Sequence, residues 1–231
     1  PPRSTLFPYT TLFRSRTLES MSGLRFLSFD GSLGLQQYFL NPTPAAGDYF
    51  GLSVAAVGGD VLIGAYGDDT GAIDSGAVYL FDGVTGVLKR TFANPTPGPY
   101  DYFGLSVAAV GGDVLIGASY DDTGAIDSGL AYLFDGVTGV LKRTFANPTP
   151  GPSDFFGCSV AAVGGDVLIG AYSDDTGAID SGAAYLFDGV TGAVKRTFAN
   201  PTPGPYDYFG HSVAAVGGDV LIGAYSDDTG A

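Results

Sequence analysis

A repeat with a 53-residue period dominates the sequence. Its clearest marker is the tetrapeptide Asn-Pro-Thr-Pro, which begins at Asn41, Asn94, Asn147 and Asn200. The copies cover about 41–93, 94–146, 147–199 and, truncated, 200–231. A period near 50 residues predicts a β-propeller or a solenoid, in which each unit buries its faces only against its neighbours. We therefore expect residues 16–231 to form one repeat module.

Each repeat unit predicts four β-strands. In the first copy they lie at 52–57, 61–66, 77–81 and 87–92. Gly58-Gly59 separates the first two strands, and paired glycines supply the positive φ that two-residue hairpin loops need. The first strand is rich in small residues, and the next two are apolar on both faces, as expected for a sheet between two others. The fourth carries Lys89-Arg90, and charged residues blunt an exposed edge.

This order of strands predicts an all-β fold of four-stranded antiparallel propeller blades. Three blades are complete, at 50–92, 103–145 and 156–198, and two are half blades, at 24–40 and 209–225. The two half blades could in principle pair and close a ring, but we expect an open arc, on the ground of the family resemblance given below.

Composition excludes several classes of function. The net charge is −14, which disfavours nucleic acid and anionic membrane surfaces as partners. The single Cys and single His exclude a disulfide scaffold, a CxxC zinc site and multi-histidine metal sites. No apolar run approaches the roughly 18 residues of a membrane helix, so we expect no membrane insertion.

Residues 5–15 stand apart from the repeat. They read Thr-Leu-Phe-Pro-Tyr-Thr-Thr-Leu-Phe-Arg-Ser, which resembles the in-frame translation of a common sequencing-adapter primer. Such segments are excluded from fold reasoning. We expect residues 1–15 to be a contaminant that packs poorly against the sheets, the alternative being a genuine N-terminal strand. The absence of a signal peptide then says nothing about secretion.

The paired motifs of each copy resemble the FG-GAP repeat. In the first copy they are Phe50-Gly51 and Gly64-Ala65-Tyr66, with Tyr or Ser where the family usually has Pro. That repeat builds the seven-bladed propeller of integrin α-chains and of many bacterial surface and secreted proteins. The resemblance implies a non-catalytic binding, adhesion or structural module of a secreted or cell-surface protein, with a protein or carbohydrate ligand. The alternative is a propeller accessory to an enzyme whose catalytic part lies outside this sequence.

Calcium-binding members of that family carry an Asp-x-Asp-x-Asp-Gly-like loop between the two motifs. Here the same place holds only Gly58-Gly59-Asp60. One carboxylate cannot supply the six to eight oxygens that Ca²⁺ prefers. We therefore do not carry the family's calcium site over, and we expect no cofactor.

An Asp-rich loop between the second and third strands is the remaining candidate for a low-affinity Ca²⁺ site. Its carboxylates recur in three copies as Asp68, Asp69 and Asp74, as Asp121, Asp122 and Asp127, and as Asp174, Asp175 and Asp180. The alternative, which we favour, is that these side chains accept backbone N–H groups in Asx turns. Their spacing matches no EF-hand loop.

No catalytic residue is predicted. His211 and Cys158 occupy a repeat position that holds Leu52 and Leu105 in the other copies, so this position does not require a chemically reactive side chain. The serines that follow the Asp-rich loops have no recurrent base nearby to activate them. Tyr and Phe are numerous, and either inter-blade packing or a sugar-binding rim accounts for aromatic residues of this kind.

Overall fold

The computed structural model describes residues 23–29 and 33–228, and within them the chain is all β. The first complete sheet consists of β3 (Val54–Val57), β4 (Asp60–Ala65), β5 (Ala77–Asp82) and β6 (Leu88–Ala93). The second consists of β7 (Ser106–Val110), β8 (Asp113–Ala118), β9 (Leu130–Phe134) and β10 (Leu141–Ala146). The third consists of β11 (Ser159–Val163), β12 (Asp166–Ala171), β13 (Ala183–Phe187) and β14 (Val194–Ala199). The strands of each sheet pair antiparallel in chain order, as predicted for propeller blades.

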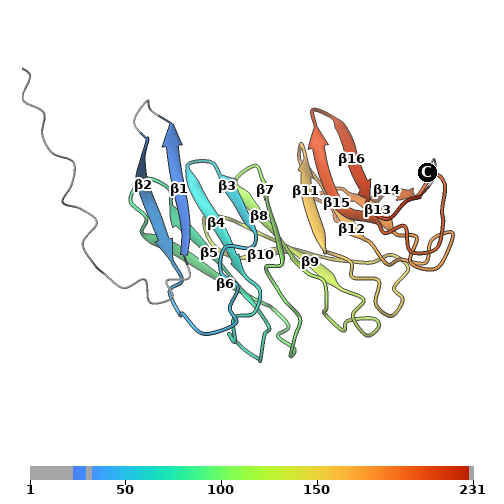
Figure 1. The fold of residues 1–231 in the computed structure, drawn as a ribbon, viewed down its shortest axis with the longest axis horizontal. Coiled ribbons are helices and arrows are strands. Elements are labelled where there is room, and N and C mark those ends of the chain that lie inside the picture. The colour runs from blue at the N-terminus through green and yellow to red at the C-terminus, as the bar shows by residue number, and fades with distance from the viewer. Residues whose placement is uncertain (1–22, 30–32, 229–231) are drawn as a thin grey trace, which may run out of the picture.

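Two half blades flank the complete ones. β1 (Gly23–Phe29) pairs with β2 (Leu33–Leu40), and β15 (Phe209–Val216) pairs with β16 (Asp219–Ala224). They lie at opposite ends of the row of sheets, so the blades form an open arc, as predicted (Figure 1). Residues 1–15, which were predicted to pack poorly against the sheets, lie outside the described residues, so this prediction stays untested. In the described part of the chain, no helix is long and apolar enough to cross a membrane.

The four strands of a blade differ in burial as the sequence predicted. The first strands β3, β7, β11 and β15 contact one another in succession and form the inner row. The second and third strands are buried on both faces, with β5 and β9 almost fully covered. The fourth strands are mostly exposed and form the outer edge.

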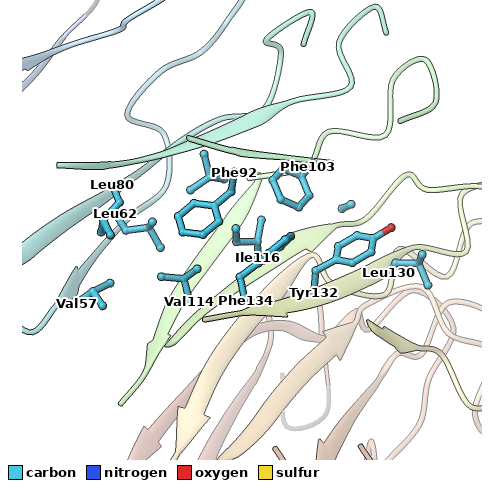
Figure 2. Packing of buried hydrophobic residues seen from close by; sticks show 12 residues of the cluster. Val57, Leu62, Leu80, Phe92, Phe103, Val114, Ile116, Leu130, Tyr132 and Phe134 are labelled. Atoms are coloured by element: carbon cyan, nitrogen blue, oxygen red, sulfur yellow. The ribbon is translucent and has the colours of Figure 1, made fainter. Parts of the chain in front are cut away.

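Large apolar side chains fill the spaces between blades. Between the first two complete blades, Leu62, Leu80 and Phe92 face Val114 and Phe134 (Figure 2). The equivalent residues of the second and third blades form a second cluster, in which Ala131 and Ala183 stand in place of Val78 and Leu130. Each blade therefore buries its apolar faces by packing against its neighbours, as the repeat period implied.

The outer strands carry a bulge at each lysine. The register between β5 and β6 shifts so that Lys89 has no partner on β5, and the same shift skips Lys142 and Lys195. The bulge directs Lys89 toward the second strand, where its Nζ lies 2.6 Å from Asp60 Oδ2. Lys142 and Lys195 make the same ion pair in their blades. Two of the adjacent arginines reach the next blade: Arg90 donates to the Val137 carbonyl, and Arg143 Nε donates to the Val190 carbonyl at 2.8 Å. Arg196 instead lies over the Phe198 ring.

The glycine hairpins differ in one detail from the prediction. Only the first glycine of each pair has a positive φ, 60° at Gly58 and 61° at Gly111. A positive φ at the first central residue alone is the pattern of a type II′ turn, which matches the twist of the two flanking strands. The second glycine is therefore not required by backbone conformation.

Candidate functional site

The Asp-rich loops follow the second strands, at the end of each blade opposite the glycine hairpins. The first carboxylate of each loop is buried and fully engaged. Asp68 accepts the Tyr79 hydroxyl at 2.6 Å and the backbone N–H of Thr70 at 2.9 Å. Asp121 and Asp174 accept the same groups from Tyr132 and Tyr185 and from their own Thr two residues on. Burial, reinforced by the bond to Asp68, raises the pKa of Tyr79, so this phenol stays a donor.

The other two carboxylates of each loop do not join the first around one point. Asp69 Oδ1 accepts the backbone N–H of Asp74 at 2.9 Å, and the second and third copies repeat this bond. Asp74 itself has a φ of 50°. In the described residues, no group of three or more His, Cys, Asp or Glu side chains is placed to hold a metal ion. The Asx-type hydrogen bonds are present, and the calcium hypothesis stays a prediction.

We expect calorimetry of the full chain to show no micromolar Ca²⁺ binding, because these carboxylates already accept protein donors. The control is a chain in which Asp68, Asp69 and Asp74 are changed to Asn. Micromolar binding that disappears in this control would overturn the expectation and assign Ca²⁺ to the loop.

A further carboxylate in each connection between blades was not singled out in the sequence. These residues are Asp48, Asp101, Asp154 and Asp207, all nearly inaccessible to solvent. Asp101 Oδ2 accepts the Asn94 side chain at 2.7 Å and the Gly98 N–H at 2.6 Å. The bonds hold Asn-Pro-Thr-Pro against the residues before Phe-Gly. The recurrence of Asp two residues before Phe-Gly in all four copies could have identified this carboxylate from the sequence.

Burial raises the pKa of Asp101 and of Asp154 to about 6, against hydrogen bonds that lower it, and the nearby charges of Asp121 and Asp174 add to the increase. Each folded pKa lies above the unfolded value near 3.9, so the folded chain binds more protons between pH 4 and 6. We expect the free energy of unfolding to increase as pH falls from 7 to about 4.5, by about 1–3 kcal/mol for each carboxyl.

Urea unfolding at several pH values measures this effect. The matched variant, Asp101→Asn with Asp154→Asn, keeps the hydrogen-bond acceptors and removes the titration, so its stability should vary less with pH. The expectation is contradicted if wild-type stability instead decreases steadily from pH 7 to pH 5.

Backbone hydrogen bonds fasten each Asp-rich loop to the connection that follows. Tyr100, Tyr102 and Phe103 donate their N–H groups to the carbonyls of Ile73, Asp74 and Ser75, at 2.8, 3.2 and 2.9 Å. The next two loops are held in the same way. Loop and connection therefore form one continuous surface across neighbouring blades.

Eight aromatic rings form an unbroken row over this surface. We call this row the aromatic ladder, and it consists of Tyr49, Tyr66, Tyr102, Tyr120, Phe155, Tyr172, Tyr208 and Tyr225. Successive ring centroids lie 4.7 to 5.7 Å apart. In the second copy the tyrosine stands one residue later, at Tyr120 instead of Ser119, yet its ring still fills the row. Packing between blades was one of the roles expected for the aromatic residues, but this row was not predicted from the sequence.

The glycines of the two repeat motifs meet between blades. Gly104 N–H donates to the Gly117 carbonyl within one blade, and Gly104 O accepts the Ser53 hydroxyl of the preceding blade at 2.6 Å. A Cβ on Gly64 would lie 2.2 Å from Gly104 O. Phe103, next in the motif, is fully buried in the inter-blade core. Phe-Gly and Gly-Ala are thus the two sides of one blade-to-blade contact.

The model of the FG-GAP repeat matches this chain four times, at 36–81, 97–134, 150–187 and 203–231. These matches cover more than half of the chain and coincide with the geometry just described. The chain belongs to the FG-GAP repeat family. No curated protein matches it.

Two solved structures similar to this FG-GAP chain are computationally designed proteins. Ika8 matches with a TM-score of 0.46 and 15% identity over 76% of this chain and 43% of its own length. The FG-GAP chain therefore spans less than half of the length of Ika8. Ika4 matches with a TM-score of 0.47 and 17% identity over 75% of this chain and 84% of its own.

The two ends of the FG-GAP blades differ in charge. The ladder face comprises the loops and connections, at 41–49, 66–76, 94–102, 119–129, 147–155, 172–182, 200–208 and 225–228. These segments contain Asp in every copy and no Lys, Arg or His. The hairpin face comprises the glycine hairpins and the turns after the third strands, and the three lysine ion pairs lie there. Burial, followed by the Asp74 charge, raises the pKa of Tyr102 on the ladder face.

His211 and Cys158 were the two residues of the repeat with reactive side chains. The His211 ring contacts Tyr172 and Tyr225 edge-on and lies beside the ladder. Burial raises the pKa of the Cys158 thiol to about 11, so it stays protonated and unreactive at neutral pH. Both residues follow the Phe-Gly motif, as Leu52 and Leu105 do. His211 lies within β15, whereas the other three lie one or two residues before the first strand of their blade.

Proposed function

We propose that this FG-GAP chain is a non-catalytic binding module of a secreted or cell-surface protein, and that its ladder face contacts a positively charged protein partner. Family membership supports the module and its location. The single observation that carries the partner class is the combination of a continuous row of aromatic rings with loops and connections that contain Asp and no Lys, Arg or His.

Aromatic side chains suit a binding surface because they offer a large contact area at a small loss of conformational entropy. Two tyrosines project beside the ladder without belonging to it, Tyr100 and Tyr206, and they are 50% and 53% exposed. Backbone bonds to the preceding loop hold each in place. The exposed rings are therefore pre-organised, which lowers the cost of binding.

The charge distribution favours a cationic partner. Asp69, Asp122 and Asp175 are exposed on the ladder face, and each accepts one backbone N–H. Among the described residues, the ion pairs of the lysines are made with other aspartates. A face with charge of one sign steers an oppositely charged partner and raises its association rate. The lysines cannot neutralise this face, because they are paired at the other end of the blades.

Binding of a fluorescent oligolysine peptide tests the proposal through two matched triple variants. One changes Asp69, Asp122 and Asp175 to Asn on the ladder face. The other changes Asp82, Asp135 and Asp188 to Asn on the hairpin face, where each also accepts backbone N–H groups. Each triple variant removes three negative charges and keeps a side-chain oxygen that accepts the backbone N–H groups.

We expect the ladder-face triple variant to weaken binding at least tenfold and the hairpin-face variant less than threefold. Changing Tyr100 and Tyr206 to Ala should weaken binding further at constant charge, since it removes contact area and no charge. Equal losses from both triple variants would mean that net charge alone binds the peptide, and the proposal would fail.

A further inference from the structure

We propose that two tyrosine pairs of the ladder, Tyr49 with Tyr66 and Tyr208 with Tyr225, are sites of oxidative cross-linking that yields an intramolecular dityrosine in each. The product is a covalent bond between the two phenol rings. The inference goes beyond binding and does not depend on which partner occupies the ladder face.

The geometry of these two pairs carries the inference. The rings of Tyr49 and Tyr66 are 4.7 Å apart and inclined by 3°, and those of Tyr208 and Tyr225 are 5.2 Å apart and inclined by 14°. The two phenol rings of each pair are therefore stacked on one another. The Gly67 N–H also donates to the Asp48 carbonyl, so the backbones next to Tyr66 and Tyr49 run together.

Solvent reaches one ring of each pair. Tyr49 is 60% exposed and Tyr225 is 66% exposed, whereas their partners are half-buried. An oxidant can therefore act on the exposed ring, and that ring has room to rotate as the new bond forms. The two pairs occupy the same positions of the repeat, in the first and fourth copies.

The chemistry requires a one-electron oxidant, here a haem peroxidase with hydrogen peroxide. Each phenol loses one electron and one proton to become a phenoxyl radical. The two radicals combine at the ring carbons beside the oxygens, and transfer of the two ring hydrogens to the oxygens restores both phenols. One hydrogen peroxide accepts the two electrons and two protons and becomes two waters, so each cross-link removes two hydrogens from the chain.

The two middle copies supply internal controls. The third copy stacks Phe155 on Tyr172 at 5.1 Å and 13°, the same geometry without a second phenol. The second copy places Tyr102 and Tyr120 at 75°, so one ring points its edge at the other. Tyr100 and Tyr206 are nearly as exposed as Tyr49, but they are not stacked on their neighbours.

Treatment of the dilute full chain with peroxidase and hydrogen peroxide, followed by proteolysis and mass spectrometry, tests the proposal. We expect cross-linked peptides, each short of two hydrogens, that join positions 49 to 66 and 208 to 225 at a yield independent of protein concentration. Tyr49→Phe and Tyr225→Phe should each remove only their own link.

These substitutions exchange Tyr and Phe only, and circular dichroism checks that each variant folds like the wild type. Links that form only between molecules, or that map mainly to Tyr100 and Tyr206, would show that exposure and not stacking directs the reaction.

Discussion

Gly117→Ala is expected to destabilise the chain by about 3 kcal/mol or more, because no room exists for a methyl group there. A Cβ at this position would lie 2.0 Å from the carbonyl oxygen of Gly157 in the next blade and 2.4 Å from Ser106 Oγ. That carbonyl already accepts the Ser106 hydroxyl at 2.7 Å. The blades must separate to admit the methyl group, and urea unfolding measures the loss.

Gly112→Ala is the matched control for this prediction. Gly112 is the second glycine of its hairpin, its φ is not positive, and a Cβ there would meet nothing within 4 Å. We expect a change within about 0.5 kcal/mol. If both substitutions cost the same, steric contact between the Gly-Ala and Phe-Gly motifs does not explain why the repeat keeps glycine.

Phe103→Ala should cost about 3–5 kcal/mol, since it leaves a cavity between two blades. The ring is fully buried, and its centroid lies 5.8 Å from the ring centroid of Tyr132 and 6.1 Å from that of Phe134. Its backbone N–H, which donates to the Ser75 carbonyl, is kept in the variant. The measured loss therefore reports side-chain packing.

The repeat supplies a graded control for Phe103. Phe209 occupies the same position in the C-terminal half blade, where it is only partly buried. Phe209→Ala should cost less than half as much as Phe103→Ala in the same urea titration. Equal costs would contradict the view that these aromatic residues gain their stabilisation from complete blades on both sides.

Most of the blade architecture follows from local pattern. The strands begin and end within two residues of the predicted positions, because paired glycines and Asp-Gly turns fix the ends of short apolar runs. The lysines of the outer strands were predicted to blunt an edge, and they lie at bulges on that edge. What the pattern did not show is that Arg90 and Arg143 reach the next blade, because this contact depends on the angle between blades.

The aromatic ladder could not be derived from the sequence for a related reason. Tyr66 and Tyr102 are far apart along the chain, and their rings meet only across the boundary between two blades. Tyr102 also has a φ of 55°, a conformation that a bulky side chain rarely adopts. Its backbone bond to the Asp74 carbonyl holds it there.

The role of the buried aspartates in the connections could not be predicted from the sequence either. Charged residues are almost never fully buried unless they are paired, and nothing in the sequence pattern pointed to partners for Asp101. The structure places it against Asn94 and the Gly98 N–H, which satisfy one of its oxygens. Recurrence in every copy was visible in the sequence, but its partner groups were not.

The ladder face as the binding surface is the central claim, and hydroxyl-radical footprinting of the full chain tests it most directly. The oligolysine peptide is the probe, and oxidation of exposed side chains is measured with and without it. We predict protection of Tyr49, Tyr100, Tyr206 and Tyr225 on the ladder face. Oxidation of the exposed hairpin-face residues Val84, Val137 and Val190 should be unchanged. Protection of these valines with unprotected ladder tyrosines would contradict the account.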